Sequence, residues 1–447
     1  MTTPIPFDKG QFLFGNNIRF LRDPLGLFRQ LQQQYSAQRL VSIRLGGRVL
    51  TLVLKPEETR YILQENNRNY SRGRSYKLLR EFLGDGLLTS DGDFWRRQRR
   101  LAQPAFHKQK LTNLAEIMID ESTRWTNRLA ASDRSQPIDI TDALMDVTLR
   151  IVTKTLFGAG LGEQLTGLSR ALNNLNHIAS RTVLNPIKLP AWLPTIDNRA
   201  KIKAARQVDE LILTIIQARR QSGEQRDDLL DMLLRATDDE TGEGMSDQQL
   251  RDEMVTLFTA GHETTATSMA WTLHLLAHHP DVQNRARQEI EQILAGRAQL
   301  TADDLRALPY LSQVVSESLR LYPPAWAMSR LSIGPDQLGN YTIEPEQGVL
   351  LSPYLLHHDP ETWTNPEQFD PERFAAGQRE SRHPYAFLPF GGGPRLCIGN
   401  QFALLEMQAL LAGLLLRFRV EPMDNQPVRP QPLITLRPGR SIRLWFR

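Results

Sequence analysis

The 447-residue chain has only one cysteine, Cys397. A single cysteine excludes an intramolecular disulfide, and nothing in the cysteine usage indicates secretion. The chain also lacks a long apolar run, because its longest such stretch, Ala409–Leu416, is far shorter than the roughly 20 residues that span a bilayer. Met1–Gly15 contains no basic region followed by an apolar core, so neither a signal peptide nor a transmembrane anchor is expected. We therefore expect a soluble, cytoplasmic protein.

The chain has little net charge. Its 54 Lys and Arg residues against 50 Asp and Glu give +4, too little to indicate nucleic-acid binding. The densest basic stretch is Trp95–Arg100, followed by His107–Lys110. It could steer an acidic partner, or it could be an ordinary solvated helix face. Without repeats or a convincing linker, residues 1–447 are expected to form a single domain.

The hydrophobic periodicity predicts a mainly α-helical fold with small β-sheets. A β-hairpin is expected from Leu40–Leu45 and Val49–Leu54, which flank two glycines. Helical patterns then dominate as far as Leu321, and short strands follow. A closing strand pair is expected from Leu433–Leu436 and Ser441–Trp445.

One predicted helix is unusually long. Ser246 and Gln249 have the spacing of a capping box, and Pro280 ends the pattern after His278. The helix would be about 48 Å long. Because it is apolar around most of its circumference, we expect it to run through the core and to form a wall of an active site.

Cys397 lies in the glycine-rich segment Phe390–Gly399. The glycines at 391–393 remove Cβ atoms where the backbone turns tightly or lies against a flat cofactor, and Pro394 stiffens the approach. A helix follows from Asn400, and its N-terminal N–H groups favour thiolate over thiol. Arg395 adds a cation that could bind a haem propionate. A lone cysteine is commonly an inert core thiol, but this context favours a thiolate ligand of haem iron.

A second motif lies inside the long helix, at Ala260–Thr265, where Glu263 stands beside Thr264 in otherwise apolar surroundings. Ala260 and Gly261 leave room beside the backbone, and Thr264 can hydrogen-bond to the carbonyl of Ala260 one turn earlier. Such a pair could deliver protons. In the alternative interpretation, the threonine packs inward and Glu263 reaches solvent.

A third pair, Glu317 and Arg320, has an i, i+3 spacing that places both on one helix face. Such pairs are common by chance, and an exposed one contributes under about 1 kcal/mol.

The pattern Phe-x-x-Gly-x-Arg-x-Cys-x-Gly, filled by Phe390, Gly393, Arg395, Cys397 and Gly399, resembles that of the cytochrome P450 family of haem-thiolate monooxygenases. The resemblance implies the P450 fold, with the long helix over the haem and Cys397 in the proximal loop as the iron ligand. It also implies that the catalytic residues Glu263 and Thr264 deliver protons.

The resemblance implies further cofactor contacts. Trp95, Arg99, Arg330 and Arg395 would bind the haem propionates. Arg373, in Phe369–Phe374, would join Glu317 and Arg320 in a structural trio. Some branches of the family attach haem covalently through a glutamate at the position of Ala260, so we predict non-covalent haem b here.

The implied reaction inserts one oxygen atom of O2 into an apolar small molecule, with electrons from a separate ferredoxin or flavodoxin, because no fused reductase is expected. This donor would dock at Arg96–Arg100 and near Arg395. Fatty acids and terpenoids fit equally well.

The expected pocket wall comprises Ser75–Leu88, Phe258, Thr259, Trp326, Ala327 and Met328, with Leu184–Pro194 as a lid. A peroxide-driven relative and a haem-thiolate sensor without turnover are the alternatives.

Overall fold

The computed structural model describes residues 3–11, 14–158, 195–297, 299–378 and 380–447, with a few residues between 167 and 178. The predicted lid, Leu184–Pro194, lies outside the described residues. The chain divides into two compact units. The first unit comprises Met1–Lys77, Ser316–Cys397 and Pro430–Arg437, and the second comprises Leu78–Val315, Ile398–Arg429 and Pro438–Arg447.

The second unit is built from helices that pack on one another, as the periodicity predicts. Its helices are α5 (Gly92–Ala102), α6 (Lys108–Ala131), α7 (Ile140–Phe157), α9 (Ile196–Ser222), α10 (Leu229–Arg235), α11 (Asp247–His278), α12 (Pro280–Leu294), α13 (Ala302–Arg306) and α16 (Asn400–Arg417), with the 3-10 turn Gln103–Phe106. Helix α4 (Ser75–Leu83) begins in the first unit and ends in the second, whereas α14 (Pro309–Leu321) runs from the second unit into the first.

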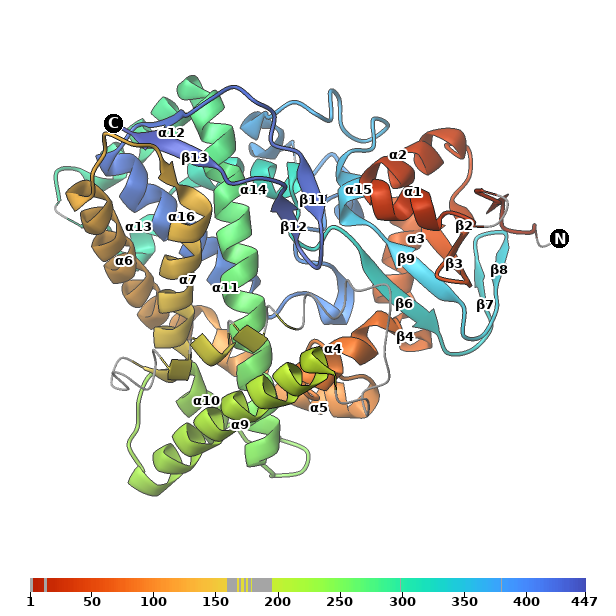
Figure 1. Ribbon diagram of the computed structural model, residues 1–447, viewed down its shortest axis with the longest axis horizontal. Coiled ribbons are helices and arrows are strands. Elements are labelled where there is room, and N and C mark those ends of the chain that lie inside the picture. Colours follow the sequence, from red (N-terminus) through yellow and green to blue (C-terminus); the bar gives the residue numbers. More distant parts are fainter. Residues whose placement is uncertain are drawn as a thin grey trace. The chain divides into compact units, whose positions relative to one another are not determined.

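Helix α11 is the long helix that the sequence predicts (Figure 1). Its 32 residues begin after Ser246, whose hydroxyl accepts from the N–H of Gln249 while the Gln249 side chain accepts from the N–H of Ser246. The reciprocal capping satisfies two donors that a helix start leaves open. Most of α11 is buried, and it packs against α7 and α9. The prediction of a long core helix is confirmed.

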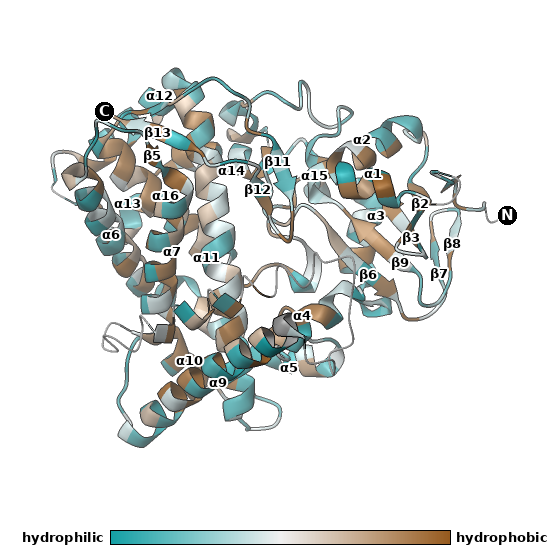
Figure 2. Ribbon diagram, viewed as in Figure 1, coloured by the Kyte–Doolittle hydropathy of each residue, from teal (hydrophilic) through white to brown (hydrophobic). Residues whose placement is uncertain are grey.

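Helix α9 shows how the second unit separates core from solvent. Figure 2 shows hydrophobic and hydrophilic segments alternating along it, and Val208, Ile212 and Ile216 are fully buried at a four-residue spacing. This spacing gives the helix one apolar face, which packs on α11.

The first unit contains a six-stranded sheet in the order β1-β2-β3-β9-β6-β4. Its strands are β1 (Phe7–Asp8), β2 (Leu40–Leu45), β3 (Arg48–Val53), β4 (Tyr70–Arg72), β6 (Met328–Ser332) and β9 (Gly348–Leu351), and β7 (Asp336–Leu338) pairs separately with β8 (Tyr341–Ile343). The β2–β3 hairpin is confirmed. Both turn glycines have positive φ, +58° at Gly46 and +76° at Gly47, the conformation that two-residue hairpin turns require.

Short helices surround this sheet. They are α1 (Asn17–Arg22), α2 (Pro24–Gln34), α3 (Pro56–Arg60), the π-helical turn η1 (Tyr61–Glu65), η2 (Asn67–Asn69), α15 (Pro353–His357), η5 (Pro371–Phe374), η6 (Pro384–Ala386) and η7 (Gly393–Arg395). Figure 1 shows α1 and α2 beside the sheet. Phe28 and Leu31 of α2 join Ile43 and Leu52 of the strands in one buried cluster.

The predicted closing strand pair is wrong. Strand β12 (Leu436–Pro438) pairs with β11 (Pro430–Pro432), because the chain already reverses at Leu433, whose N–H donates to the carbonyls of Gln431 and Thr435. Strand β13 (Arg443–Phe446) lies instead between β10 (Val420–Pro422) and β5 (Ile138–Asp139). The partners of β13 are distant in sequence, so a local turn signal could not identify them.

Among the helices of the described residues, none combines the length and the apolar character that crossing a membrane requires.

Candidate active site

The Cys397 thiol is exposed. Free cysteines are among the most buried residues, so an exposed one is not placed for packing. The segment turns back on itself here: the N–H of Cys397 donates to the carbonyl of Phe390 at 3.0 Å, and the N–H of Leu396 donates to that of Gly393 at 3.0 Å. These bonds hold the thiol at the end of a tight loop, as a metal ligand requires.

Two glycines of this loop are required by its shape. Gly391 and Gly393 have φ of +73° and +66°, which L side chains rarely adopt. A Cβ added at Gly393 would lie 1.9 Å from the carbonyl oxygen of Leu63, in η1. The loop can therefore lie directly on the η1 backbone only because residue 393 is glycine.

The loop also lies beside strand β6. A Cβ at Gly391 would be 3.9 Å from the terminal methyl group of Met328. Arg330 is two residues further along the same strand, on the same face, and only 4% of its surface is exposed. The first unit thus contains Cys397 together with two of the predicted propionate ligands, Arg330 and the partly buried Arg395.

Glu317 and Arg320 form a fully buried pair. The Arg320 guanidinium donates to both carboxylate oxygens of Glu317, at 2.7 and 2.8 Å, and Arg373 approaches the same carboxylate at 3.3 Å. Arg320 also donates to three backbone carbonyls, those of His357, Pro366 and Gln368. The guanidinium therefore holds together the loops that precede Cys397, and the interpretation of this pair as an exposed chance pair does not apply.

His357 connects this network to the Cys397 loop, and the sequence did not reveal that role. Its Nε2 accepts from the N–H of Leu388 at 2.7 Å, and its Nδ1 lies 3.1 Å from the carbonyl of Arg320. Burial first, and then the charge of Arg320, lower the pKa of His357 to about 3. The ring is neutral, so Nδ1 donates and Nε2 accepts. Its only signal in the sequence is a histidine pair, His357–His358, which resembles an ordinary helix end.

The polar motif of α11 forms an accessible stripe on an otherwise buried helix. Ala260 is exposed, and Leu257, Gly261 and Thr264 are partly exposed, whereas Glu263 is buried. The Thr264 hydroxyl donates to the carbonyl of Ala260 at 2.6 Å, as the sequence predicts. The stripe follows the three- to four-residue repeat of one helix face. This face is therefore open to a small molecule beside Thr264.

Two predicted pocket residues lie elsewhere. Phe258 is fully buried, with its ring 5.1 Å from that of His262. Its side chain is turned about 100° around the helix from that of Leu257 and is buried in the core, so its assignment to the pocket wall is wrong. Trp326 is buried in the cluster with Phe28, and its indole N–H donates to the carbonyl of Leu433 at 2.9 Å. Trp326 therefore stabilises the first unit.

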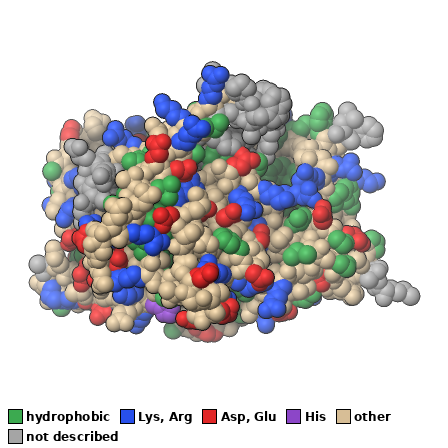
Figure 3. Space-filling view, turned by 90° about the horizontal axis from the view of Figure 1, so that it is seen from below, with side chains coloured by type: hydrophobic (Ala, Val, Ile, Leu, Met, Phe, Trp, Pro, Cys, Tyr) green, Lys and Arg blue, Asp and Glu red, His purple; other side chains and the backbone are tan. Residues whose placement is uncertain are grey.

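Trp95 and Arg99 lie one turn apart on α5, in the second unit, where Trp95 is buried and Arg99 is partly buried. The neighbouring arginines have acidic partners. Arg96 pairs with Asp93, Arg97 with Glu243, and Arg100 with Asp238 and Glu240. Figure 3 shows Lys and Arg side chains interspersed with Asp and Glu over one face of the molecule. The basic stretch is thus partly neutralised within the chain.

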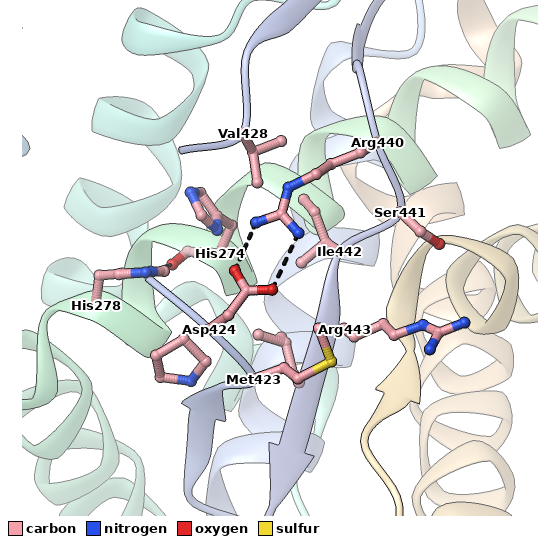
Figure 4. A pocket seen from close by; sticks show the side chains of 11 residues that line it. His274, His278, Met423, Asp424, Val428, Arg440, Ser441, Ile442 and Arg443 are labelled. Atoms are coloured by element: carbon pink, nitrogen blue, oxygen red, sulfur yellow. Dashed lines mark hydrogen bonds and ion pairs between the residues drawn. The ribbon is translucent and has the colours of Figure 1, made fainter. Parts of the chain in front are cut away.

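A hollow at the end of α11 offers no substrate site. It is lined by His274 and His278 of α11 and by the Asp424–Arg440 ion pair (Figure 4), and its volume of about 10 Å³ admits one water molecule. Burial lowers the pKa of His274 to about 4, with a smaller effect of His278. Within the described part of the chain, no three His, Cys, Asp or Glu side chains are grouped to hold a metal ion.

The residues fit a haem. The exposed Cys397 thiol, the two positive-φ glycines and the buried Arg330 gather in one unit. They offer an axial sulfur ligand, a flat approach and a cation for a carboxylate. Residue 260 is alanine, so α11 offers no carboxylate there for a covalent bond.

Comparisons with known proteins agree with this site. The cytochrome P450 family profile matches residues 5–444. A protein of Streptomyces melanosporofaciens described as cyclooctat-9-en-7-ol 5-monooxygenase is 35% identical over 414 residues, covering 92% of this chain and 88% of that protein. A protein of Mus musculus described as leukotriene-B4 omega-hydroxylase 3 is 34% identical over 397 residues, covering 83% and 75%.

Among solved structures, the crystal structure of the cytochrome P450DA heme domain matches with a TM-score of 0.89 and 28% identity, covering 100% of this chain and 98% of that one. The mainly helical fold with small sheets is therefore that of P450 haem domains. The chain belongs to the cytochrome P450 family, and it is a P450 monooxygenase.

Proposed function

We propose that the protein binds haem b non-covalently through the Cys397 thiolate and inserts one oxygen atom of O2 into an apolar small molecule. The observation that carries this proposal is the exposed Cys397 thiol at the end of a loop that only glycine can form at residue 393. The extent of the family match supports a single haem domain, and we propose a cytoplasmic location.

Each predicted cofactor contact has a role in this proposal. Arg330 and Arg395 of the first unit, and Trp95 and Arg99 of the second, would hold the propionates. When bound, haem iron with a thiolate ligand activates dioxygen and favours cleavage of the O–O bond. The Glu317, Arg320 and Arg373 network fixes the loops that precede Cys397 and does not itself react.

Glu263 and Thr264 would handle protons. Because the Thr264 hydroxyl donates to the Ala260 carbonyl, its oxygen lone pairs accept a hydrogen bond from a water molecule at the accessible stripe. Glu263, one residue earlier, would supply the proton to that water. This pair argues against a peroxide-driven relative and against a sensor without turnover, since neither needs proton delivery.

The substrate is proposed to be fatty acid-like or terpenoid-like. The two relatives are named for cyclooctat-9-en-7-ol and for leukotriene B4, and their chemistry supports both classes. Leu257, Ala260 and Gly261, on the same helix face as Thr264, present mostly apolar surface beside it. A site of this kind selects by size and apolar area.

Electrons would come from a separate acidic ferredoxin or flavodoxin. We propose docking at Arg96–Arg100 and near Arg395. Because Arg96, Arg97 and Arg100 have acidic partners within the chain, the donor would compete with Asp93, Glu243 and Asp238 for them. The rate of reduction should therefore fall steeply as ionic strength rises.

Three measurements test the proposal. The reduced carbon monoxide complex should show the spectrum typical of a haem thiolate, and a terpenoid or fatty acid should shift the resting spectrum by displacing axial water. Oxygen consumption with a reduced donor should then yield hydroxylated product. A spectrum without the thiolate band would refute the assignment of Cys397, and a normal spectrum without turnover under any donor would favour the sensor.

A further inference from the structure

The edge of the six-stranded sheet places two arginines side by side. Strand β4 pairs antiparallel with β6, and Arg72 lies directly opposite Arg330. Opposite residues of an antiparallel pair point to the same face, and like charges in that position destabilise the pair. The sheet therefore brings two guanidinium groups to one place at an energetic cost.

The next turn brings a phenol to the same place. The N–H of Gly73 donates to the carbonyl of Ser329 at 3.2 Å, and a Cβ at Gly73 would lie 1.9 Å from the Ser329 hydroxyl oxygen. Because residue 73 is glycine, the chain can turn tightly over β6, and the N–H of Tyr76 donates back to the carbonyl of Gly73 at 3.0 Å. Tyr76 thereby returns toward the arginines.

Tyr76 contacts both cations. The Arg72 guanidinium carbon lies 4.6 Å from the centre of the Tyr76 ring, and Arg72 and Arg330 both hydrogen-bond to the phenol. Burial by itself would raise the pKa of Tyr76, but the two guanidiniums outweigh it and lower the pKa. The potential at the phenol oxygen is thus positive, as at a site built for an anion.

The chemistry of the three side chains selects a carboxylate. Two guanidiniums offer parallel N–H donors, and a phenol adds an O–H donor. A carboxylate carries a full negative charge, which the neutral phenol oxygen lacks, so it attracts the two guanidiniums more strongly and can accept from them in a bidentate manner. A carboxylate would also relieve the repulsion between Arg72 and Arg330.

The place of these three side chains in the fold indicates which molecule supplies the carboxylate. Met328, two residues before Arg330 on the same strand face, lies against Gly391 of the Cys397 loop. Tyr70 of β4, on the face that carries Arg72, shares a buried cluster with Leu388, which precedes that loop. The arginines therefore belong to the sheet face on which the thiolate segment is built.

We propose that Arg72, Tyr76 and Arg330 form a carboxylate cradle that binds one haem propionate. The proposal rests on the proposed haem function and adds Arg72 and Tyr76 to its cofactor contacts. The Tyr76 hydroxyl donates a hydrogen bond to the propionate, and the two guanidiniums bind the same carboxylate from the sheet.

The test compares haem with haem dimethyl ester, whose propionates are esterified. Full-length protein is reconstituted with each, and transfer of the cofactor to excess apomyoglobin is timed. We expect Tyr76→Phe and Arg72→Gln to release haem about tenfold faster than the unchanged protein, since each loses a charge-assisted hydrogen bond. With the dimethyl ester, these variants should match the unchanged protein.

Arg74→Gln is the matched control, because Arg74 is two residues along, exposed, and paired with Glu346. It should release haem at the unchanged rate.

Unchanged rates for Tyr76→Phe and Arg72→Gln would overturn the cradle. Equal acceleration of the release of haem and of its dimethyl ester would also overturn it, because that result indicates a structural role. Weaker binding of a fatty acid, but not of its methyl ester, with normal haem release would assign the cradle to substrate and also overturn it. All of these outcomes leave the thiolate spectrum intact, whereas its absence from the unchanged protein would refute the haem function itself.

Discussion

Replacement of Arg320 by lysine should separate the shape of this side chain from its charge. Arg320 is fully buried and makes five hydrogen bonds, two to Glu317 and one each to the carbonyls of His357, Pro366 and Gln368. A lysine ammonium keeps the positive charge but has three donors and no planar fork. Arg320→Lys therefore loses at least two of these bonds.

The magnitude follows from what the lost bonds leave behind. Each buried acceptor without a donor costs about 1–3 kcal/mol, more if it is charged. Two acceptors lose their donor, and one of the two can be an oxygen of the Glu317 carboxylate. We therefore expect the free energy of unfolding to fall by about 3–5 kcal/mol. Because His357 and Leu388 are tied to the same network, the Cys397 segment should loosen as well.

The assay measures urea unfolding by circular dichroism and, separately, the haem content of the purified protein. Arg320→Lys should lower both. The matched control is Arg96→Lys, since Arg96 is exposed and pairs only with Asp93 three residues earlier among the ion pairs of the described residues; its effect should stay within about 0.5 kcal/mol. If Arg320→Lys unfolds at the same urea concentration as Arg96→Lys and retains equal haem, the guanidinium fork is not what holds these loops.

Three further predictions concern single side chains. Cys397→Ala should abolish the thiolate-type spectrum of the reduced carbon monoxide complex, and a retained band would contradict the ligand assignment. Thr264→Ala should bind haem normally but release more peroxide for each electron consumed; fully coupled turnover would argue against a role in proton delivery. Burial raises the pKa of Glu406 from 4.5 to about 8, so the folded protein holds this proton more tightly than the unfolded chain, and stability should fall as pH rises from about 4.5 to about 8. Glu406→Gln should flatten that decline in the urea midpoint, and an unchanged slope would contradict it.

Features that local chemistry determines could be predicted from the sequence. The start of α11 follows from the reciprocal bonds of Ser246 and Gln249, and its end follows from Pro280, which cannot continue the hydrogen-bond ladder. The β2–β3 hairpin follows from two glycines that reach positive φ without strain. Each signal lies within a few residues of the feature it specifies.

Features that depend on distant partners could not be predicted in this way. Strand β13 pairs with β10 and β5, although a turn signal at Pro438 and Gly439 favours a neighbouring partner. The role of His357 depends on Leu388, 31 residues later, and no periodicity connects them. Phe258 and Leu257 are equally apolar in the sequence, and only the packing of α11 shows that Leu257 faces the open stripe.

The sequence motif and the pairing of the strands also differ in what they say about the cofactor. The family motif identifies Arg330 and Cys397 one position at a time, but it says nothing of how the sheet brings Arg72 opposite Arg330. Repulsion between these two cations at the sheet edge would disfavour that register unless a bound anion compensates for it. A tight turn follows β4 directly, where a Cβ at residue 73 would collide with Ser329 of β6. The positive charge at this edge is therefore a property of the backbone, and the fold prepares the carboxylate site before the ligand arrives.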